Sequence, residues 1–139
     1  MQTLQKLLPN DKNLFYLSLV QIQDQIENLV SRFYYYFLDT EAAILFKDTD
    51  MEKQKKMFYV SLAFLIAHID NPILLNEHLK LVVTKHKQYG VTSKHIPYFI
   101  DSFMSAIKET LGDDNERIIS IWNSVIYEIM SFFNEQLSL

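Results

Sequence analysis

The chain contains no cysteine and very little glycine or proline. Its 139 residues include two glycines, three prolines and no cysteine. The absence of cysteine excludes disulfides, thiolate catalysis and zinc sites built on thiolates. Turns, hairpins and bulges depend on glycine and proline, so their scarcity argues against a sheet and favours helices.

Features of a nucleic-acid-binding, membrane or secreted protein are also missing. The net charge is −4 and the basic residues are scattered along the sequence, so no basic stripe predicts nucleic-acid binding. The longest apolar run, from about residue 57 to 67, is too short to span a bilayer. Residues 9–11 interrupt the first apolar residues, so the start of the sequence shows no signal-peptide pattern. We expect a soluble cytoplasmic protein with no nucleic-acid or membrane partner.

Hydrophobic residues make up 49% of the chain and aromatic residues 14%. This is enough for one sizeable core, and the length leaves little room for a second. Apolar residues recur at helical spacing almost everywhere. The sequence therefore predicts a single all-α domain over residues 1–139.

The first helical stripe is long for a single globular helix. It follows a candidate cap at Asn10 or Asp11, and no glycine or proline divides it, so we expect two helices or one bent helix. The stripe could also support a homodimer instead of a monomer, although packing into the core is the simpler use. Its apolar members are Phe15, Leu19, Ile22, Ile26, Leu29, Val30, Phe33 and Phe37.

Local signals mark the ends of the later helices. Thr49 opens a capping-box pattern with Glu52, which predicts a helix that runs to about Ile69 and is buried on most sides. Asn71-Pro72 then predicts a cap and a first helical residue, and Gly90 a stop after Tyr89.

Two further helices complete the predicted bundle. We expect Ser93 to cap the first of them and Gly112 to end it, and Asp113 or Asp114 to cap the last. The predicted inward residues are Ile96, Phe99, Ile100, Phe103, Ile107 and Leu111 in the first helix, and Ile118, Trp122, Val125, Ile129 and Phe132 in the last.

One histidine continues an apolar helix face. Leu75, Leu79, Val82 and His86 share a face by their spacing, so the imidazole of His86 should point inward. A hydrogen-bonded core histidine is one interpretation. The other is an iron ligand, because a single imidazole suffices when a porphyrin supplies the remaining four nitrogens.

The segment around this histidine, TKHKQYGVTSKHIPYF (84–99), resembles the proximal-histidine segment of bacterial single-domain haemoglobins and of the globin domain of flavohaemoglobins. Further similarities are FYYYFL (33–38), HIDN (68–71), AIKETLG (106–112) and Trp122. The resemblance covers roughly residues 33–133. It implies a globin fold of six to eight helices that enclose a haem b group.

The resemblance also implies roles for individual residues. His86 becomes the axial iron ligand, and Gln54 lies on the distal helix above the iron. Tyr34 matches the family's distal tyrosine if two residues are deleted, whereas an ungapped count places Arg32 or Phe33 there. Further haem contacts implied by the resemblance are Phe46, Phe58, Val82 and Val91.

One position departs from the family pattern. Flavohaemoglobins have a tyrosine ten residues after the proximal histidine, within a His-Tyr-Glu network, and here that residue is Ile96. Tyr98 would point elsewhere, and Glu135 is the nearest candidate for the glutamate. We expect weaker electron donation to the iron, with His86 donating to a backbone carbonyl near residues 81–83.

Three functions remain open at this stage. The first is reversible binding of dioxygen or another diatomic gas, for storage, delivery or sensing. The second is a nitric oxide dioxygenase or peroxidase-like globin; since the sequence has no GxGxxG stretch or flavin domain, it would need a separate reductase. The third is a haem-free globin-fold signalling module. The sequence favours gas binding over catalysis.

Overall fold

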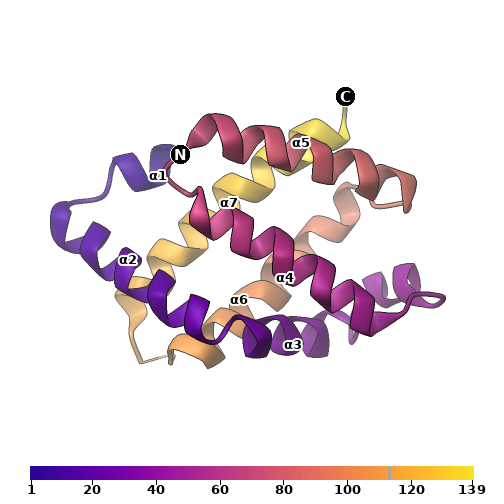
Figure 1. The fold of residues 1–139 in the computed structure, drawn as a ribbon, viewed down its shortest axis with the longest axis horizontal. Helices are drawn as coiled ribbons and strands as arrows, with labels where there is room; N and C mark the ends of the chain where they lie inside the picture. Colours follow the sequence, from indigo (N-terminus) through magenta and orange to yellow (C-terminus); the bar gives the residue numbers. More distant parts are fainter. Residues whose placement is uncertain (113) are drawn as a thin grey trace.

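The computed structural model describes residues 1–112 and 114–139, and these residues form helices without any strand. The all-α prediction is therefore confirmed. Figure 1 shows the arrangement. The elements are α1 (Gln2–Gln5), α2 (Pro9–Asp24), α3 (Ile26–Phe37), the 3-10 helix η1 (Glu41–Phe46), α4 (Met51–Ala67), α5 (Pro72–Gln88), the 3-10 helix η2 (Ser93–His95), α6 (Ile96–Leu111) and α7 (Glu116–Leu137).

The first stripe is divided between two helices, as predicted. The break lies at Gln25, whose φ of −124° and ψ of 22° leave the helical region. The change of direction lets α2 pack against α7 while α3 packs along α6. The predicted cap at Asn10 or Asp11 is wrong, because Leu8 is the N-cap and Pro9 is the first helical residue. Proline suits that position because the first amides of a helix have no partner within it.

The caps of α4 and α5 lie within one residue of those predicted. Asp50, and not Thr49, caps α4, and its carboxylate accepts from the amides of Glu52 and Lys53 at 3.1 and 3.4 Å. The helix ends at Ala67, slightly before the predicted Ile69. The predicted Asn71 cap of α5 is confirmed by a bond of 3.2 Å from the Leu74 amide.

Glycine ends α5 and α6 at the predicted places. Gly90 and Gly112 have φ values of 86° and 87°, a region that residues with a Cβ rarely adopt. The predicted Ser93 cap is wrong, because Thr92 caps η2 in a reciprocal box with His95. Asn115 caps α7 instead of Asp114, and Asp113 lies outside the described residues.

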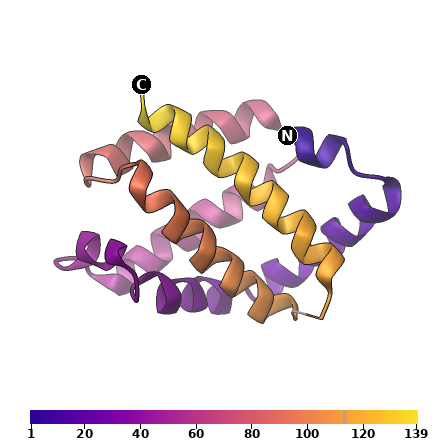
Figure 2. The same cartoon turned by 180° about the vertical axis from the view of Figure 1, so that it is seen from behind.

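The helices form two layers. α4 and α5 lie at the front in Figure 1, whereas α6 and α7 form the opposite layer, seen from behind in Figure 2. The inner faces of α6 and α7 agree with the predicted faces. Of the predicted α7 residues, Ile118, Trp122 and Val125 are buried, while Ile129 and Phe132 are only half-buried.

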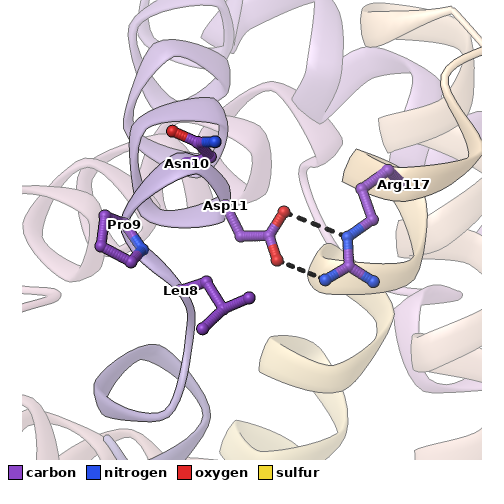
Figure 3. Close-up of a pocket in the computed structure, with 5 residues that line it drawn as sticks. All are labelled: Leu8, Pro9, Asn10, Asp11 and Arg117. Carbon is purple, nitrogen blue, oxygen red and sulfur yellow. Dashed lines mark hydrogen bonds and ion pairs between the residues drawn. The ribbon is translucent and has the colours of Figure 1, made fainter.

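The packing between α2 and α7 combines a buried aromatic pair with polar bonds. The rings of Phe15 and Trp122 lie 5.0 Å apart, and the Trp122 indole donates to the Ser18 hydroxyl at 2.8 Å. At the start of α2, Asp11 pairs with Arg117 of α7 across a surface pocket (Figure 3). The Nε–Oδ1 distance of this pair is 3.1 Å. Asp11 therefore joins the two helices instead of capping one.

α4 differs from its prediction in burial. Only Leu62 and Ile66 of this helix are fully buried. The side chains of Met57 and Val60 are 52% and 65% exposed. The prediction that α4 is buried on most sides is therefore wrong. None of the helices in the described part of the chain is long and apolar enough to cross a membrane.

Candidate functional site

In the described part of the chain, a hydrogen bond and a ring contact join the central turns of α4 and α5. The hydroxyl of Ser61 lies 2.8 Å from Nε2 of His78, and the Phe64 and His78 rings are 4.5 Å apart. From this contact the helices diverge toward the beginning of α4 and the end of α5, as both ribbon views show. We call this the open end of the α4–α5 pair.

Apolar side chains occupy the facing stripes of the two helices toward the open end. Met57 precedes Ser61 by four residues and Leu81 follows His78 by three, so each lies on the same helix face as the contact. Leu81 is 67% exposed. Most of its side chain therefore gains none of the stabilisation that removal of apolar surface from water would give. Facing apolar surfaces of this kind fit a large, flat apolar group between the helices.

Tyr34, Gln54, Phe58 and Phe46 come together near the beginning of α4. The Gln54 amide donates to the Tyr34 hydroxyl oxygen at 2.9 Å. The rings of Phe46 and Phe58 lie edge-on to Tyr34, with centroids 5.8 and 5.9 Å away. Four residues from α3, η1 and α4 that were assigned to the haem pocket by resemblance are thus neighbours.

The alternatives to Tyr34 lie elsewhere. Arg32 donates to Thr110 of α6 at 2.9 Å and lies 3.7 Å from the Glu109 carboxylate. Phe33 is fully buried in an aromatic cluster with Phe99 and Phe103. Of the three candidates, Tyr34 is therefore the one that contacts Gln54.

Tyr34 is a neutral donor in this environment. Only 3% of its surface is exposed. Burial raises its pKa to about 12, and the bond from Gln54 offsets this only in part, because burial disfavours the phenolate. Since the tyrosine oxygen accepts from Gln54, its own O–H remains available for another acceptor.

His86 projects from α5 on the other side. Its Nδ1 lies 2.7 Å from the Val82 carbonyl oxygen, and its ring stands edge-on to Phe133 of α7, 5.4 Å away. A carbonyl can only accept, so Nδ1 carries the proton and Nε2 has a free lone pair. Burial lowers the pKa of His86 and the Val82 bond opposes this in part, so the neutral, ligating form is favoured.

The predicted carbonyl partner of His86 is thereby confirmed as Val82. The turn after α5 is closed by a bond of 3.1 Å from the Val91 amide to the His86 carbonyl. Val82 and Val91 are both half-buried and pack against the core. This local structure holds the imidazole at the end of α5.

In the part of the chain that the structure describes, no carboxylate is hydrogen-bonded to His86. Ile96 cannot donate or accept, and Glu135 is exposed. The Glu41 carboxylate raises the pKa of Tyr98, mainly through a hydrogen bond, so this tyrosine is engaged with η1. Among the described residues, the Val82 carbonyl is the polar partner of the His86 ring.

Sequence reasoning missed two histidines that shape the site. His95 accepts from the Thr92 amide at 3.0 Å and fixes the turn before α6. Its place in a box pattern three residues after Thr92 was a usable signal, although glutamate or glutamine is usual there. His78 joins α5 to Ser61 of α4, a contact for which the sequence offers no signal.

Metal binding by protein ligands alone is not supported in the described part of the chain. No group of three His, Cys, Asp or Glu side chains there could hold a metal ion. An iron bound to His86 would therefore need its other ligands from a prosthetic group. The single free imidazole nitrogen beside facing apolar walls fits haem.

Comparison with known proteins identifies the protein family to which the chain belongs. The sequence profile of the Globin family matches residues 31–133, and the chain belongs to this family. The match confirms the globin fold, and membership of the family implies a haem-binding protein. The matched region contains each of the residues assigned above to the haem site.

A more specific similarity links the chain to a flavohaemoglobin. It is 23% identical over 103 residues to a Flavohemoprotein of Xylella fastidiosa strain Temecula1. The alignment covers 72% of this chain and 26% of that protein. The chain thus spans about a quarter of this relative's length, and the similarity confirms the suspected group of bacterial globins.

Proposed function

We propose that the chain binds haem b through Nε2 of His86 and reversibly binds dioxygen on the side of Tyr34 and Gln54. The observation that carries the proposal is the Gln54–Tyr34 hydrogen bond, which leaves the tyrosine proton free to donate. Ferrous haem, when bound, supplies the iron at which a diatomic gas binds. Oxygen bound at this iron would draw electron density from it, so a nearby hydrogen-bond donor would stabilise the bound oxygen.

The residues of the candidate haem site have different roles in this proposal. His86 holds the iron, and the Val82 carbonyl fixes the ring tautomer. Tyr34 donates to the gas and Gln54 orients the tyrosine hydroxyl. Phe46 and Phe58 flank Tyr34 and exclude water, and Val82 and Val91 contribute apolar contacts to the haem.

The proximal side favours gas binding over catalysis. A strong acceptor on Nδ1 would increase electron donation by the imidazole, but the partner here is a neutral carbonyl of the same helix. Nitric oxide oxidation or peroxidase-like chemistry would also need an external reductant. We therefore propose storage, delivery or sensing of a diatomic gas, with dioxygen as the first ligand to test.

The experiment is reconstitution of the purified protein with haemin. We expect a Soret band at one haem per chain, and reversible spectral change when the reduced protein meets oxygen. The matched control for His86→Ala is His68→Ala, which alters the half-buried histidine at the end of α4. Haem retention that is unchanged in His86→Ala would contradict the proposal.

A further inference from the structure

The lysines look scattered in the sequence, but the charges are divided unequally between two parts of the chain. Residues 51–95, from α4 through η2, contain seven lysines and three acidic residues, a net charge of +4. The remaining residues contain six basic and fourteen acidic side chains, a net charge of −8. The two helices beside the candidate haem site are therefore basic within an acidic protein.

Four of these lysines define a basic face at the open end of the α4–α5 pair. Lys53 and Lys56 lie at the beginning of α4, Lys85 in the last turn of α5 and Lys94 in η2, and all four are exposed. The beginning of α4 and the end of α5 are at the same end of the molecule, on the right in Figure 1. None of the four forms an ion pair with a described residue.

The acidic residues of this segment do not neutralise the face. Of these three, Glu52 is the one near the face, in the first turn of α4. Asp50, just before the segment, is also near, and its carboxylate accepts from the amides of Glu52 and Lys53. Asp70 lies at the opposite end of α4 and accepts a hydrogen bond from Tyr16. Glu77 is exposed near the contact between His78 and α4.

The basic face also adjoins the candidate haem site. Lys53 precedes Gln54, and Lys85 precedes His86. Lys85 follows His78 by seven residues and so lies on the face of α5 that turns toward α4. Exposed Met57 follows Lys53 by four residues and exposed Leu81 precedes Lys85 by four, so each apolar residue lies one turn from a lysine on the same helix face. Apolar residues thus adjoin charged ones, as in many protein interfaces.

We propose that this basic face docks the acidic surface of an electron-donor protein. The inference rests on the proposed function, because bound iron that has been oxidised must be reduced before it binds oxygen again. With haem bound, one electron from the reduced one-electron group of the donor would convert ferric iron to ferrous iron, and no atom would be transferred. The donor is identified by two properties: a negatively charged surface and a one-electron group near that surface.

Charge complementarity supports this partner. A cluster of one sign on a protein of opposite net charge orients the approach of a complementary partner and raises association rates by about 10- to 1000-fold. The effect weakens as salt is added, since the Debye length is about 8 Å at physiological ionic strength. An acidic partner would be repelled by the rest of the molecule, so docking is directed to the haem side.

The test uses photoreduced flavodoxin, an acidic flavin protein, as the donor and the ferric haem-bound chain as the acceptor. The rate constant of haem reduction is measured by stopped flow from low to high salt. We expect the wild-type rate to fall about tenfold across this range. Lys53→Glu/Lys94→Glu should reduce the low-salt rate by about tenfold and remove most of the salt dependence.

Lys6→Glu/Lys108→Glu is the matched control. It produces the same net charge as the test variant, because each pair of reversals changes −4 to −8. Lys6 and Lys108 are exposed. Lys6 follows α1 and Lys108 lies in the last turn of α6, so both are outside the segment 51–95 that carries the basic face. Circular dichroism checks the fold of both variants. A control that loses as much rate as the test variant would overturn the proposal.

A second readout separates docking from haem binding. Calorimetry measures the affinity of oxidised flavodoxin for the haem-free and haem-bound chains at low and at high salt. A dissociation constant raised about tenfold in Lys53→Glu/Lys94→Glu alone supports docking, whether or not haem is retained. If the wild-type chain binds flavodoxin without salt dependence, the docking proposal is wrong. It is also wrong if the chain does not bind flavodoxin but binds phosphatidylserine vesicles in a way that depends on these lysines. Failure to retain haem contradicts only the proposed function.

Discussion

Large apolar side chains differ in burial between two parts of the same helical bundle. Between α2 and α7, Phe15 is fully buried against Trp122, whose indole nitrogen is satisfied by Ser18. Between α4 and α5, Met57, Val60 and Leu81 are more than half exposed. Both parts have sequences of similar apolar character, so hydrophobicity alone does not distinguish them.

The difference shows which interface the chain completes by itself. The α2–α7 packing leaves no large apolar surface among these residues, and the Asp11–Arg117 pair closes its edge. Among the described residues, the α4–α5 pair has contacts of Ser61 and Phe64 with His78. Its exposed apolar residues become buried only if another group lies between the helices. The first interface is a structural core, whereas in the proposed function the second is a binding surface.

The largest expected effect concerns that binding surface. His86→Ala removes the imidazole whose Nε2 is free to bind iron, so the haem dissociation constant should rise by more than about 100-fold. Haem transfer to apomyoglobin measures the change. External imidazole should restore the Soret band in His86→Gly. Equal haem loss in His86→Ala and His68→Ala would contradict the assignment.

The next prediction compares the stability of the two interfaces. Phe15→Ala opens a cavity in a complete core and should cost about 3–5 kcal/mol of unfolding free energy. Phe58 is half-buried, so Phe58→Ala in the haem-free protein should cost only about 1–2 kcal/mol. Urea titration measures both values. Equal losses in the haem-free protein would mean that the second interface is already complete.

The third prediction separates the two distal polar residues. Tyr34→Phe removes the direct donor, worth about 1.5–3 kcal/mol, so oxygen should dissociate about 10- to 100-fold faster. Gln54→Leu removes only the group that orients the tyrosine, which we expect to cost about 1 kcal/mol, or roughly fivefold. Stopped-flow displacement by carbon monoxide measures both rates. If neither rate rises, the distal hydrogen-bond hypothesis is wrong.

A pH titration of the haem-free protein tests the burial of two histidines. Burial lowers the pKa of His86 and of His78 below 6.5, so the unfolded chain binds more protons than the folded one in this range. Stability is complete above about pH 6.5 and decreases as the pH falls toward the lowered values. Urea unfolding at about pH 7.5 and 5.5 measures the decrease. His86→Gln should make the decrease smaller.

The helices could be predicted because their signals are local. Helical spacing of apolar residues, Asn71-Pro72 and the two glycines act within a few residues, and these elements were located correctly. The caps were misassigned by one residue at Thr49, Ser93 and Asp114, and by two or three at Asn10 or Asp11. Neighbouring polar residues are equally able to cap in isolation, and the path of the preceding loop decides between them.

The site was predicted where the contact is local or the family pattern is specific. The Val82 carbonyl is one turn before His86 in the same helix, so its bond follows from helix geometry. The Ser61–His78 contact joins two helices and has no sequence signal. The burial of α4 was predicted wrongly because an apolar sequence does not show whether other protein residues or a cofactor cover the side chains.

The smallest expected effect concerns Ile96 and separates a gas carrier from a catalyst. The ring proton of His86 goes to the Val82 carbonyl, which pulls less strongly than a carboxylate, so the imidazole should be an ordinary neutral ligand. Resonance Raman of the deoxy ferrous protein should give an iron–histidine stretching frequency in the normal globin range. Ile96→Tyr should leave it nearly unchanged, because Glu135 is exposed and supplies no carboxylate to a new network. A wild-type frequency in the peroxidase-like range would show a stronger acceptor at Nδ1. If Glu135→Gln then lowered that frequency, the enzyme hypothesis would replace the carrier hypothesis.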